Sequence, residues 1–184
     1  MRYFPEASID EFFSDFSQPI TSSDSFRQGM RRLTGGVTVV TSRSEANEPL
    51  GMTATAVCSL SVSPPSLLVC AYSLGSLAMA IKRTSPLCVN LLTAGQEAIA
   101  RTCSGAPGPQ RFQSADWSMD EDGVPVLNTA LARFHCRVTE LIPVATHLLI
   151  VGQVAHVHLP EKSDAALAYH DGKFISVGCD QPSD

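Results

Sequence analysis

The sequence has few charged residues and no cluster of one sign. Charged side chains make up 17% of the 184 residues, and the formal net charge is −5. The 13 lysines and arginines are scattered and form no run. Proteins that bind nucleic acids neutralise phosphates with clustered basic groups, so this composition argues against a nucleic-acid partner.

Long apolar segments are missing as well. No stretch of the sequence is long and apolar enough to span a bilayer. A secretory signal peptide needs a continuous apolar run near the N-terminus, and Asp10, Glu11 and Asp15 interrupt the sequence there. We therefore expect a cytoplasmic protein with no membrane partner.

The motifs of several common sites are absent too. The six cysteines include no C-x-x-C pair and no zinc-like spacing, and Cys70 and Cys88 lie in apolar runs typical of buried, reduced thiols. His156 and His158 alternate in one predicted strand, but no third ligand is evident, so we expect no metal site. There is no G-x-G-x-x-G after a strand and no G-x-S-x-G. Any nicotinamide nucleotide must therefore bind outside a Rossmann site, and a serine-hydrolase elbow is excluded.

Apolar residues, by contrast, are plentiful. They make up 44% of a chain whose length suits one domain with a sizeable core. The low charged fraction leaves fewer charges than usual to cover the surface of a monomer. Part of the surface is therefore expected to be buried against a partner chain.

Residues 1–24 are predicted to be an extension ahead of the main domain. A short amphipathic helix is expected there, with Ser8 and Glu11 as a capping box. This helix either packs on its own domain or forms an arm that covers a dimer partner or the mouth of an active site. Its apolar face is formed by Ile9, Phe12, Phe13 and Phe16.

A second helix and then a β-rich domain are expected over residues 25–178, with a polar tail over 179–184. The helix carries Phe26, Met30 and Leu33, and Gly35 and Gly36 are predicted to end it. Many strands with few short helices favour a mainly β fold, a β-barrel with short flanking helices. The strands are expected over 37–41, 51–60, 66–72, 87–92, 130–141 and 147–159, and the helices over 73–83 and 96–102.

The predicted strand over 51–60 is unusual because Thr53, Ala54, Thr55 and Ala56 have almost no side-chain bulk. Such a strand either packs tightly within the barrel or lets a backbone or a flat ligand lie against it. It is therefore the first candidate for a binding site.

Several segments in a fixed order resemble the flavin reductase components of two-component flavin monooxygenases. The resemblance covers nearly all of residues 25–175. The first segments are residues 35–41, 51–54, 61–65 and 67–70. Residues 89–92 follow, then Gln96, and then the pair Arg111 and Phe112 ahead of Trp117. The last segments are His147 followed by residues 152–154, and Tyr169 followed by residues 172–174.

This resemblance implies an FMN-binding split β-barrel that forms a homodimer. It implies an NAD(P)H:flavin oxidoreductase that uses NADH or NADPH to reduce FMN or FAD and supplies the reduced flavin to a partner monooxygenase. Two alternatives stay open. One is a reductase that acts directly on an imine or enone in a biosynthetic pathway, with Phe12, Phe16 or Trp117 lining its pocket. The other is a non-catalytic split-barrel protein that binds a flavin or another ligand.

The resemblance also implies roles for particular residues. The loop that holds Ser73, Ser76 and Leu77 starts a helix and either binds a flavin phosphate or merely caps the helix. His147 stands where the family has a residue associated with nicotinamide nucleotide binding, so it is the catalytic candidate, without a proton-transfer role. Tyr169, His170 and Phe174 resemble a segment that approaches the cofactor, from the same or the other subunit, and the alternative is that they only pack the tail. The strand residues expected to bind the flavin are Gly51, Met52, Thr53, Ala54, Thr55 and Ala56.

The chain departs from the family pattern at four places. Two of them are the S-x-T loop, where this chain has Gly75, Ser76 and Leu77, and the G-D-H motif, where it has Ala145, Thr146 and His147. The family usually reads T-A-N-S where this chain has Thr53 to Ala56, so two polar side chains are changed or lost. After the helix that contains Gln96, the family often has Arg-Phe, where this chain has Thr102 and Cys103. We expect the neighbouring Arg101 to supply the missing charge to the flavin phosphate near Ser76.

Overall fold

The computed structural model describes residues 21–106, 108–161 and 164–178. The predicted helix over Ile9 to Phe16 and the polar tail over 179–184 lie outside these residues. Residues 21–33 and the residues from Thr34 onward belong to separate compact units, and we treat each by itself.

The first unit contains helix α2 (Ser23–Arg31). Its N-cap is Ser22, whose hydroxyl accepts a hydrogen bond from the backbone N–H of Ser25 at 3.1 Å, as the serine-rich sequence predicts. Phe26 and Met30 are exposed. The helix ends at Arg31, before the glycines that were predicted to end it.

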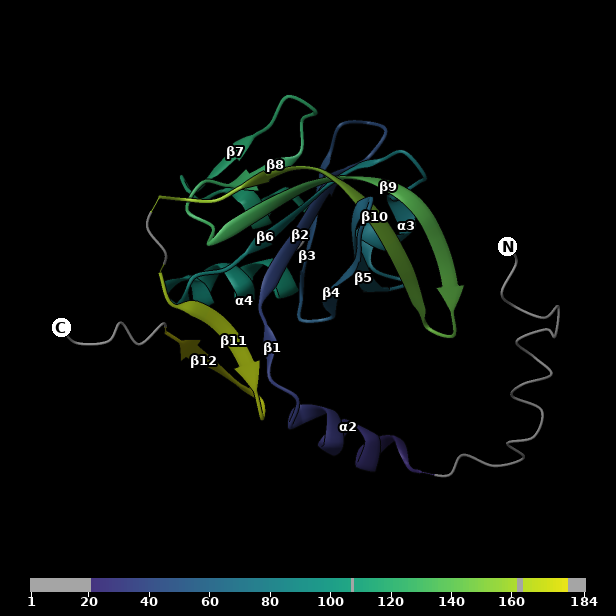
Figure 1. Cartoon of the computed structure of the whole chain (residues 1–184), viewed down its shortest axis with the longest axis vertical. Coiled ribbons are helices and arrows are strands. Elements are labelled where there is room, and N and C mark those ends of the chain that lie inside the picture. The colour runs from purple at the N-terminus through teal and green to yellow at the C-terminus, as the bar shows by residue number, and fades with distance from the viewer. Residues whose placement is uncertain (1–20, 107, 162–163, 179–184) are drawn as a thin grey trace, which may run out of the picture. The chain divides into compact units, whose positions relative to one another are not determined.

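The second unit consists of strands and short helices (Figure 1). Its strands are β1 (Gly35–Gly36), β2 (Thr38–Arg43), β3 (Pro49–Ala54), β4 (Val57–Val62), β5 (Pro65–Tyr72), β6 (Pro86–Leu91), β7 (Trp117–Met119), β8 (Pro125–Leu127), β9 (Ala132–Val144), β10 (His147–His158), β11 (Ala166–His170) and β12 (Lys173–Val177). Its helices are α3 (Ser76–Ala80), η1 (Ala94–Gln96), α4 (Glu97–Gly105) and η2 (Gly108–Phe112).

Seven strands form one antiparallel sheet in the order β3-β2-β6-β9-β10-β5-β4. Strands β3 and β4 are its two ends, although they follow one another in sequence. Leu50 of β3 and Val69 of β5 nevertheless share one buried cluster, so the sheet curls around a common core. This is the split β-barrel that the resemblance implied, and the prediction of a mainly β fold is confirmed.

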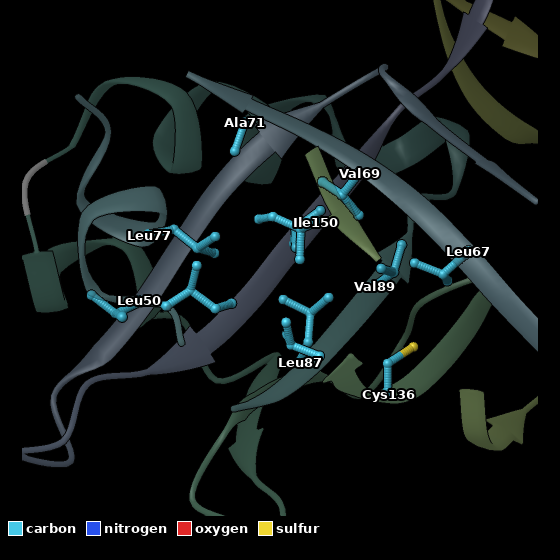
Figure 2. Packing of buried hydrophobic residues seen from close by; sticks show 12 residues of the cluster. Leu50, Leu67, Val69, Ala71, Leu77, Leu87, Val89, Cys136 and Ile150 are labelled. Atoms are coloured by element: carbon cyan, nitrogen blue, oxygen red, sulfur yellow. The ribbon is translucent and has the colours of Figure 1, made fainter. Parts of the chain in front are cut away.

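The core inside this curled sheet is almost wholly aliphatic (Figure 2). Leu87 and Val89 of β6 and Ile150 of β10 are at most 2% exposed. Leu77 of α3 points into the same cluster, so this short helix closes one part of the barrel. Burial of such side chains stabilises the fold by about 1.5–3 kcal/mol each.

A smaller layer covers the outside of the sheet. Strand β1 pairs with β11, and β11 pairs with β12. Helix α4 packs its buried Ala100 and Cys103 against Val37 and Val39. Figure 1 shows β11 and β12 on the same side of the barrel as α4.

Three sequence predictions about elements need correction. The expected single strand over 51–60 is two strands, because the chain turns at Thr55 and Ala56, where the Ala56 carbonyl accepts a hydrogen bond from Cys70 N–H at 3.0 Å. The expected helix over 73–83 is only α3, because Ile81 adopts an extended backbone and is buried in the core. Gly35 and Gly36 do not end a helix, because they pair with Tyr169 and Ala168 as strand β1.

Basic side chains gather where β9 pairs with β10. His156 lies opposite His135, with the ring centroids 5.9 Å apart, and His158 lies opposite Arg133. The positive charge of Arg133, then desolvation and the two neighbouring histidines, lower the pKa of His158 below its ordinary value of 6.5.

Replacing His158 with glutamine is expected to reduce the loss of stability in mild acid. Unfolded chains bind a proton at His158 near pH 6.5, whereas the folded chain binds it only at lower pH. The free energy of unfolding therefore falls as the pH drops from about 6.5 through the folded pKa. Urea unfolding at about pH 7.5 and about pH 5 measures this fall. An identical fall in His158→Gln and the unaltered chain would show that His158 makes no contribution.

Candidate functional site

A cavity of about 370 Å³ lies at the end of β3, where the chain turns toward β4. Two residues of β5, Gly75 with the first two residues of α3, two residues of α4, Arg111 of η2 and the first residue of β10 complete its wall. It brings together nine of the eleven predicted site residues, which are Gly51, Met52, Thr53, Ala54, Thr55, Ala56, Ser76, Leu77 and His147.

One side of this cavity is formed by small residues and available backbone. Thr55 and Ala56 are exposed, and their N–H groups donate no hydrogen bond to the described residues. The Thr53 hydroxyl is already used, because it donates to the Ala100 carbonyl at 2.6 Å. A flat polar ligand can therefore reach the backbone at the turn without displacing large side chains.

Arg111 supplies the positive charge of the cavity. Its Nη1 donates to the Gly51 carbonyl at 2.8 Å and to Ser76 Oγ at 3.2 Å. Its Nε is buried and has no hydrogen-bond partner among the described residues. A buried donor without a partner is costly, so an acceptor from a ligand would be stabilising here.

The helix η2 that carries Arg111 packs closely on β3. Phe112 lies so near Gly51 that a Cβ atom on this glycine would come within 2.7 Å of the Phe112 Cζ atom. Phe112 in turn meets Trp117 edge to face, with ring centroids 5.1 Å apart. Gly51 therefore allows the close approach that brings Arg111 to the cavity.

In the sequence, Arg111 stands out only as part of the resemblance, and no role was predicted for it. The signal that was available is its pairing with Phe112, ahead of the only tryptophan. Its contact with Ser76 is a long-range one, which neither periodicity nor a local motif reveals.

His147 lies at the rim of the cavity. It is the first residue of β10 and stands opposite Tyr72 of β5. The two rings meet edge to face at 5.9 Å, and His147 Nδ1 lies 3.0 Å from Thr146 Oγ1. This aromatic pair gives the rim a surface on which a second flat group can rest.

Two predicted site residues lie elsewhere. Ser73 does not line the cavity, and its backbone N–H donates to the Thr146 carbonyl at 3.0 Å. Arg101, predicted beside Ser76, instead lines a neighbouring cavity of about 340 Å³. There its guanidinium lies 5.0 Å from the centre of the Phe174 ring and pairs with Glu97.

The electrostatics of the first cavity favour an anion. Among the described residues, those that line it include Arg111 but no aspartate or glutamate. Cys103 also lines it, but burial raises the pKa of this thiol to about 11. It is therefore protonated at neutral pH and is no candidate nucleophile.

The described residues hold no other recognisable reactive site. No group of three or more His, Cys, Asp or Glu side chains within them is placed to bind a metal ion. None of the described helices is long and apolar enough to cross a membrane.

Comparisons with known proteins agree on one family. The model of the family described as "Flavin reductase like domain" matches residues 30–178. The FMN reductase (NADH) RutF of Ancylobacter novellus is 37% identical over 150 residues, which cover 80% of this chain and 82% of that protein. The 4-hydroxyphenylacetate 3-monooxygenase reductase component of Pseudomonas aeruginosa is 34% identical over 166 residues, or 89% of this chain and 96% of that protein.

Solved structures show the same likeness. BorF, the flavin reductase component of a bacterial two-component tryptophan halogenase, superposes with a TM-score of 0.78 at 28% identity, covering 86% of this chain and 99% of that one. The Streptomyces globisporus NADH:FAD oxidoreductase SgcE6, solved in complex with NAD and FAD fragments, gives a TM-score of 0.78 at 27% identity. That match covers 89% of this chain and 99% of SgcE6.

Proposed function

The chain belongs to the flavin reductase-like domain family, and we propose that its cavity at the end of β3 binds the flavin that this family reduces. The protein is an oxidoreductase that moves a hydride from NADH to a flavin. The observation that carries the site assignment is Arg111, which reaches Gly51 and Ser76 while its Nε is buried without a partner. FMN is the proposed flavin, since the RutF relatives are named FMN reductases that use NADH.

The residues of the cavity fit an FMN molecule at both ends. The small residues Thr55 and Ala56 leave room for the flat ring, and their backbone N–H groups can donate to acceptors on its edge. Arg111 and Ser76 offer donors to the phosphate, and a guanidinium suits phosphate better than an ammonium because it donates in a planar fork. The phosphate would also satisfy the buried Nε of Arg111.

A bound flavin supplies the hydride acceptor, and reduction consumes one NADH and one proton per flavin. The protein contributes binding and orientation. The strand end fixes one face of the ring, and the pair formed by Tyr72 and His147 borders the space where the nicotinamide would lie. We assign His147 this orienting role, because hydride transfer depends on the two rings being held close and parallel.

Replacing Ala56 with phenylalanine is expected to raise the KM for FMN at least about tenfold, because a ring at this position fills the space proposed for the flavin. Ala56 is exposed, so the substitution does not disturb the core. Ala115→Phe is a matched control, since Ala115 is exposed and lines neither cavity. Steady-state oxidation of NADH with varied FMN measures the change. Equal KM values in the two variants would place the flavin elsewhere.

The activity itself is tested by following NADH oxidation with and without added FMN. Oxidation that depends on added flavin supports the proposal, and its absence with both FMN and FAD would refute it. The alternative of a reductase acting directly on an organic substrate gains no support, since Trp117 lines neither cavity. Phe12 and Phe16 lie outside the described residues.

We further propose that the reduced flavin passes to a separate monooxygenase. The relative from Pseudomonas aeruginosa is named a monooxygenase reductase component, and BorF is a reductase component of a two-component system. Reoxidation of the reduced flavin by a purified two-component monooxygenase, coupled to product formation, is the test. No coupling with any flavin-dependent oxygenase of this type would refute the proposal.

We also propose that the chain forms a homodimer and that it is located in the cytoplasm. An apolar groove of about 460 Å³ lies along β4, the edge strand of the sheet, and Leu60 and Val62 beside it are exposed. A second copy of the chain would cover this groove, in line with the low charged fraction. Light scattering that gives the mass of a monomer would contradict the dimer. The five cysteines within the described residues are free thiols, which suits a reducing compartment.

A further inference from the structure

Arg111 reaches the cavity at the end of β3 from a short segment with few backbone contacts. Helix η2 has five residues, and 3₁₀ turns have poor hydrogen-bond geometry. Among the described residues, no backbone hydrogen bond joins η2 to another element. The Cys103 thiol lies 4.0 Å from the Arg111 carbonyl, which is a weak contact. The packing of the neighbouring Phe112 side chain therefore fixes where η2 lies.

Phe112 packs against two residues that come from different elements. The first is Gly51 of β3, where an added Cβ atom would lie 2.7 Å from Phe112 Cζ. The second is Trp117 of β7, whose ring lies 5.1 Å from the Phe112 ring at an interplanar angle of 88°. Edge-to-face pairs of this kind are favourable beyond the area that they bury. The position of Phe112 thus depends on Trp117 as well as on β3.

Trp117 is itself anchored to the barrel. It pairs with Leu127 of β8, and its side chain packs against the buried cluster to which Leu127 belongs. Strand β8 is joined to the large sheet at two points. The Leu127 N–H donates to Asn90 Oδ1 at 2.9 Å, and Thr41 Oγ1 donates to the Pro125 carbonyl at 2.6 Å. Trp117 is therefore held in place relative to the sheet, whereas η2 has no such anchor of its own.

We propose that Trp117 is a positioning residue for the flavin phosphate. It holds Phe112 against β3, and Phe112 in turn places the Arg111 guanidinium beside Ser76. The proposal rests on the proposed function of the cavity. Trp117 lines neither of the two cavities beside β3, so it acts on the phosphate through Arg111 and not by contact with the flavin. Its replacement should weaken binding of the phosphate and leave the site of the ring as it is.

The test is titration of FMN and of riboflavin with the full chain that carries Trp117→Leu, followed by quenching of flavin fluorescence. Leucine keeps an apolar side chain against the buried cluster but removes the edge-to-face contact. We expect FMN binding to weaken about five- to tenfold and riboflavin binding to change less than about twofold. The KM for FMN should rise by a similar factor, while kcat at saturating FMN stays within about twofold.

Three further variants make the test specific. Trp117→Phe keeps an aromatic ring, so its loss of FMN affinity should be smaller than that of Trp117→Leu. Phe112→Leu removes the same contact from the other residue and should also weaken FMN binding, which tests the proposal even if Trp117→Leu does not fold. Met119→Leu is the matched control, since Met119 lies on the same strand and is 56% exposed. It should bind both flavins as the unaltered chain does.

A double variant shows whether Trp117 acts through Arg111. When Arg111 is already alanine, Trp117→Leu should weaken FMN binding by less than about a further twofold, because the group that it positions is gone. Two residues with independent roles would instead show effects that add.

Three results would overturn the proposal. They are an equal loss of affinity for both flavins, unchanged FMN binding in both Trp117→Leu and Phe112→Leu, and a full further loss in the Arg111→Ala background. Failure of the proposed function has a different signature, because Arg111→Ala would then bind FMN as the unaltered chain does. If Arg111→Ala loses FMN affinity and Trp117→Leu does not, only the role of Trp117 is refuted.

Discussion

Replacing Arg111 with alanine is expected to weaken FMN binding about 10- to 100-fold while riboflavin binding stays nearly unchanged. Hydrogen bonds to charged groups contribute about 1.5–3 kcal/mol, and each 1.4 kcal/mol is a factor of ten in affinity. Riboflavin has the same ring as FMN but no phosphate, so it reports on the ring site alone. Quenching of flavin fluorescence on titration with protein measures both affinities.

The comparison of the two flavins separates binding from folding. Arg111 Nη1 also donates to the Gly51 carbonyl, so its removal also takes away a contact on β3. If that contact were all that mattered, FMN and riboflavin would lose affinity equally. Arg111→Lys keeps the charge but loses the planar fork, and an intermediate FMN affinity is expected from it. Equal losses for both flavins would show that Arg111 only supports the strand.

Replacing Asn90 with leucine is expected to destabilise the fold by about 3–5 kcal/mol, a large share of the 5–15 kcal/mol typical of a domain. Asn90 is fully buried in β6, and its Nδ2 donates to the Val39 carbonyl at 2.9 Å and to Thr41 Oγ1 at 3.2 Å. Its Oδ1 accepts from the Leu127 backbone N–H at 2.9 Å. Leucine has a similar volume but removes the acceptor of the buried Leu127 N–H and the donor to the Val39 carbonyl, while Thr41 Oγ1 keeps its bonds to the Cys88 and Pro125 carbonyls.

Urea unfolding measures this loss, and Asn128→Leu is its control. Asn128 is exposed and accepts one hydrogen bond, from Ser118 Oγ at 2.7 Å, so its replacement should cost less than about 1 kcal/mol. A similarly small loss at Asn90 would mean that water satisfies the groups it now binds. The Asn90 side chain lies on β6 and bonds to residues of β2 and β8, so replacing it is expected to destabilise contacts between three strands of the domain.

The β-rich character of the domain could be predicted from sequence because its strands have strong local signals. The run from Val37 to Thr41 is β-branched, and the run from Leu87 to Leu92 is apolar, so each predicts a strand without knowledge of its neighbours. The turn at Thr55 and Ala56 has no such signal, since neither glycine nor proline marks it. The turn depends on a hydrogen bond from the backbone N–H of Cys70, which lies in β5, the second strand after the turn.

Arg101 and Arg111 show that local sequence patterns were also insufficient to predict the site. Arg101 lies beside the Thr102 and Cys103 pair that stands where the family often has Arg-Phe, and it was therefore predicted to be the partner of Ser76. Helix α4, however, buries Ala100 and Cys103, and Arg101 lies on another side of the helix, against Phe174. Arg111 reaches Ser76 only because η2 folds back onto β3, and a contact between residues 35 apart in sequence leaves no local pattern.

A crystal structure of the chain with bound FMN would show whether the flavin lies at the end of β3 with its phosphate on Arg111. We expect the ring along Thr53 to Ala56 and phosphate oxygens within hydrogen-bond distance of the Arg111 guanidinium and Ser76 Oγ. A phosphate bound instead to Arg101, or a ring in the apolar groove along β4, would contradict this expectation.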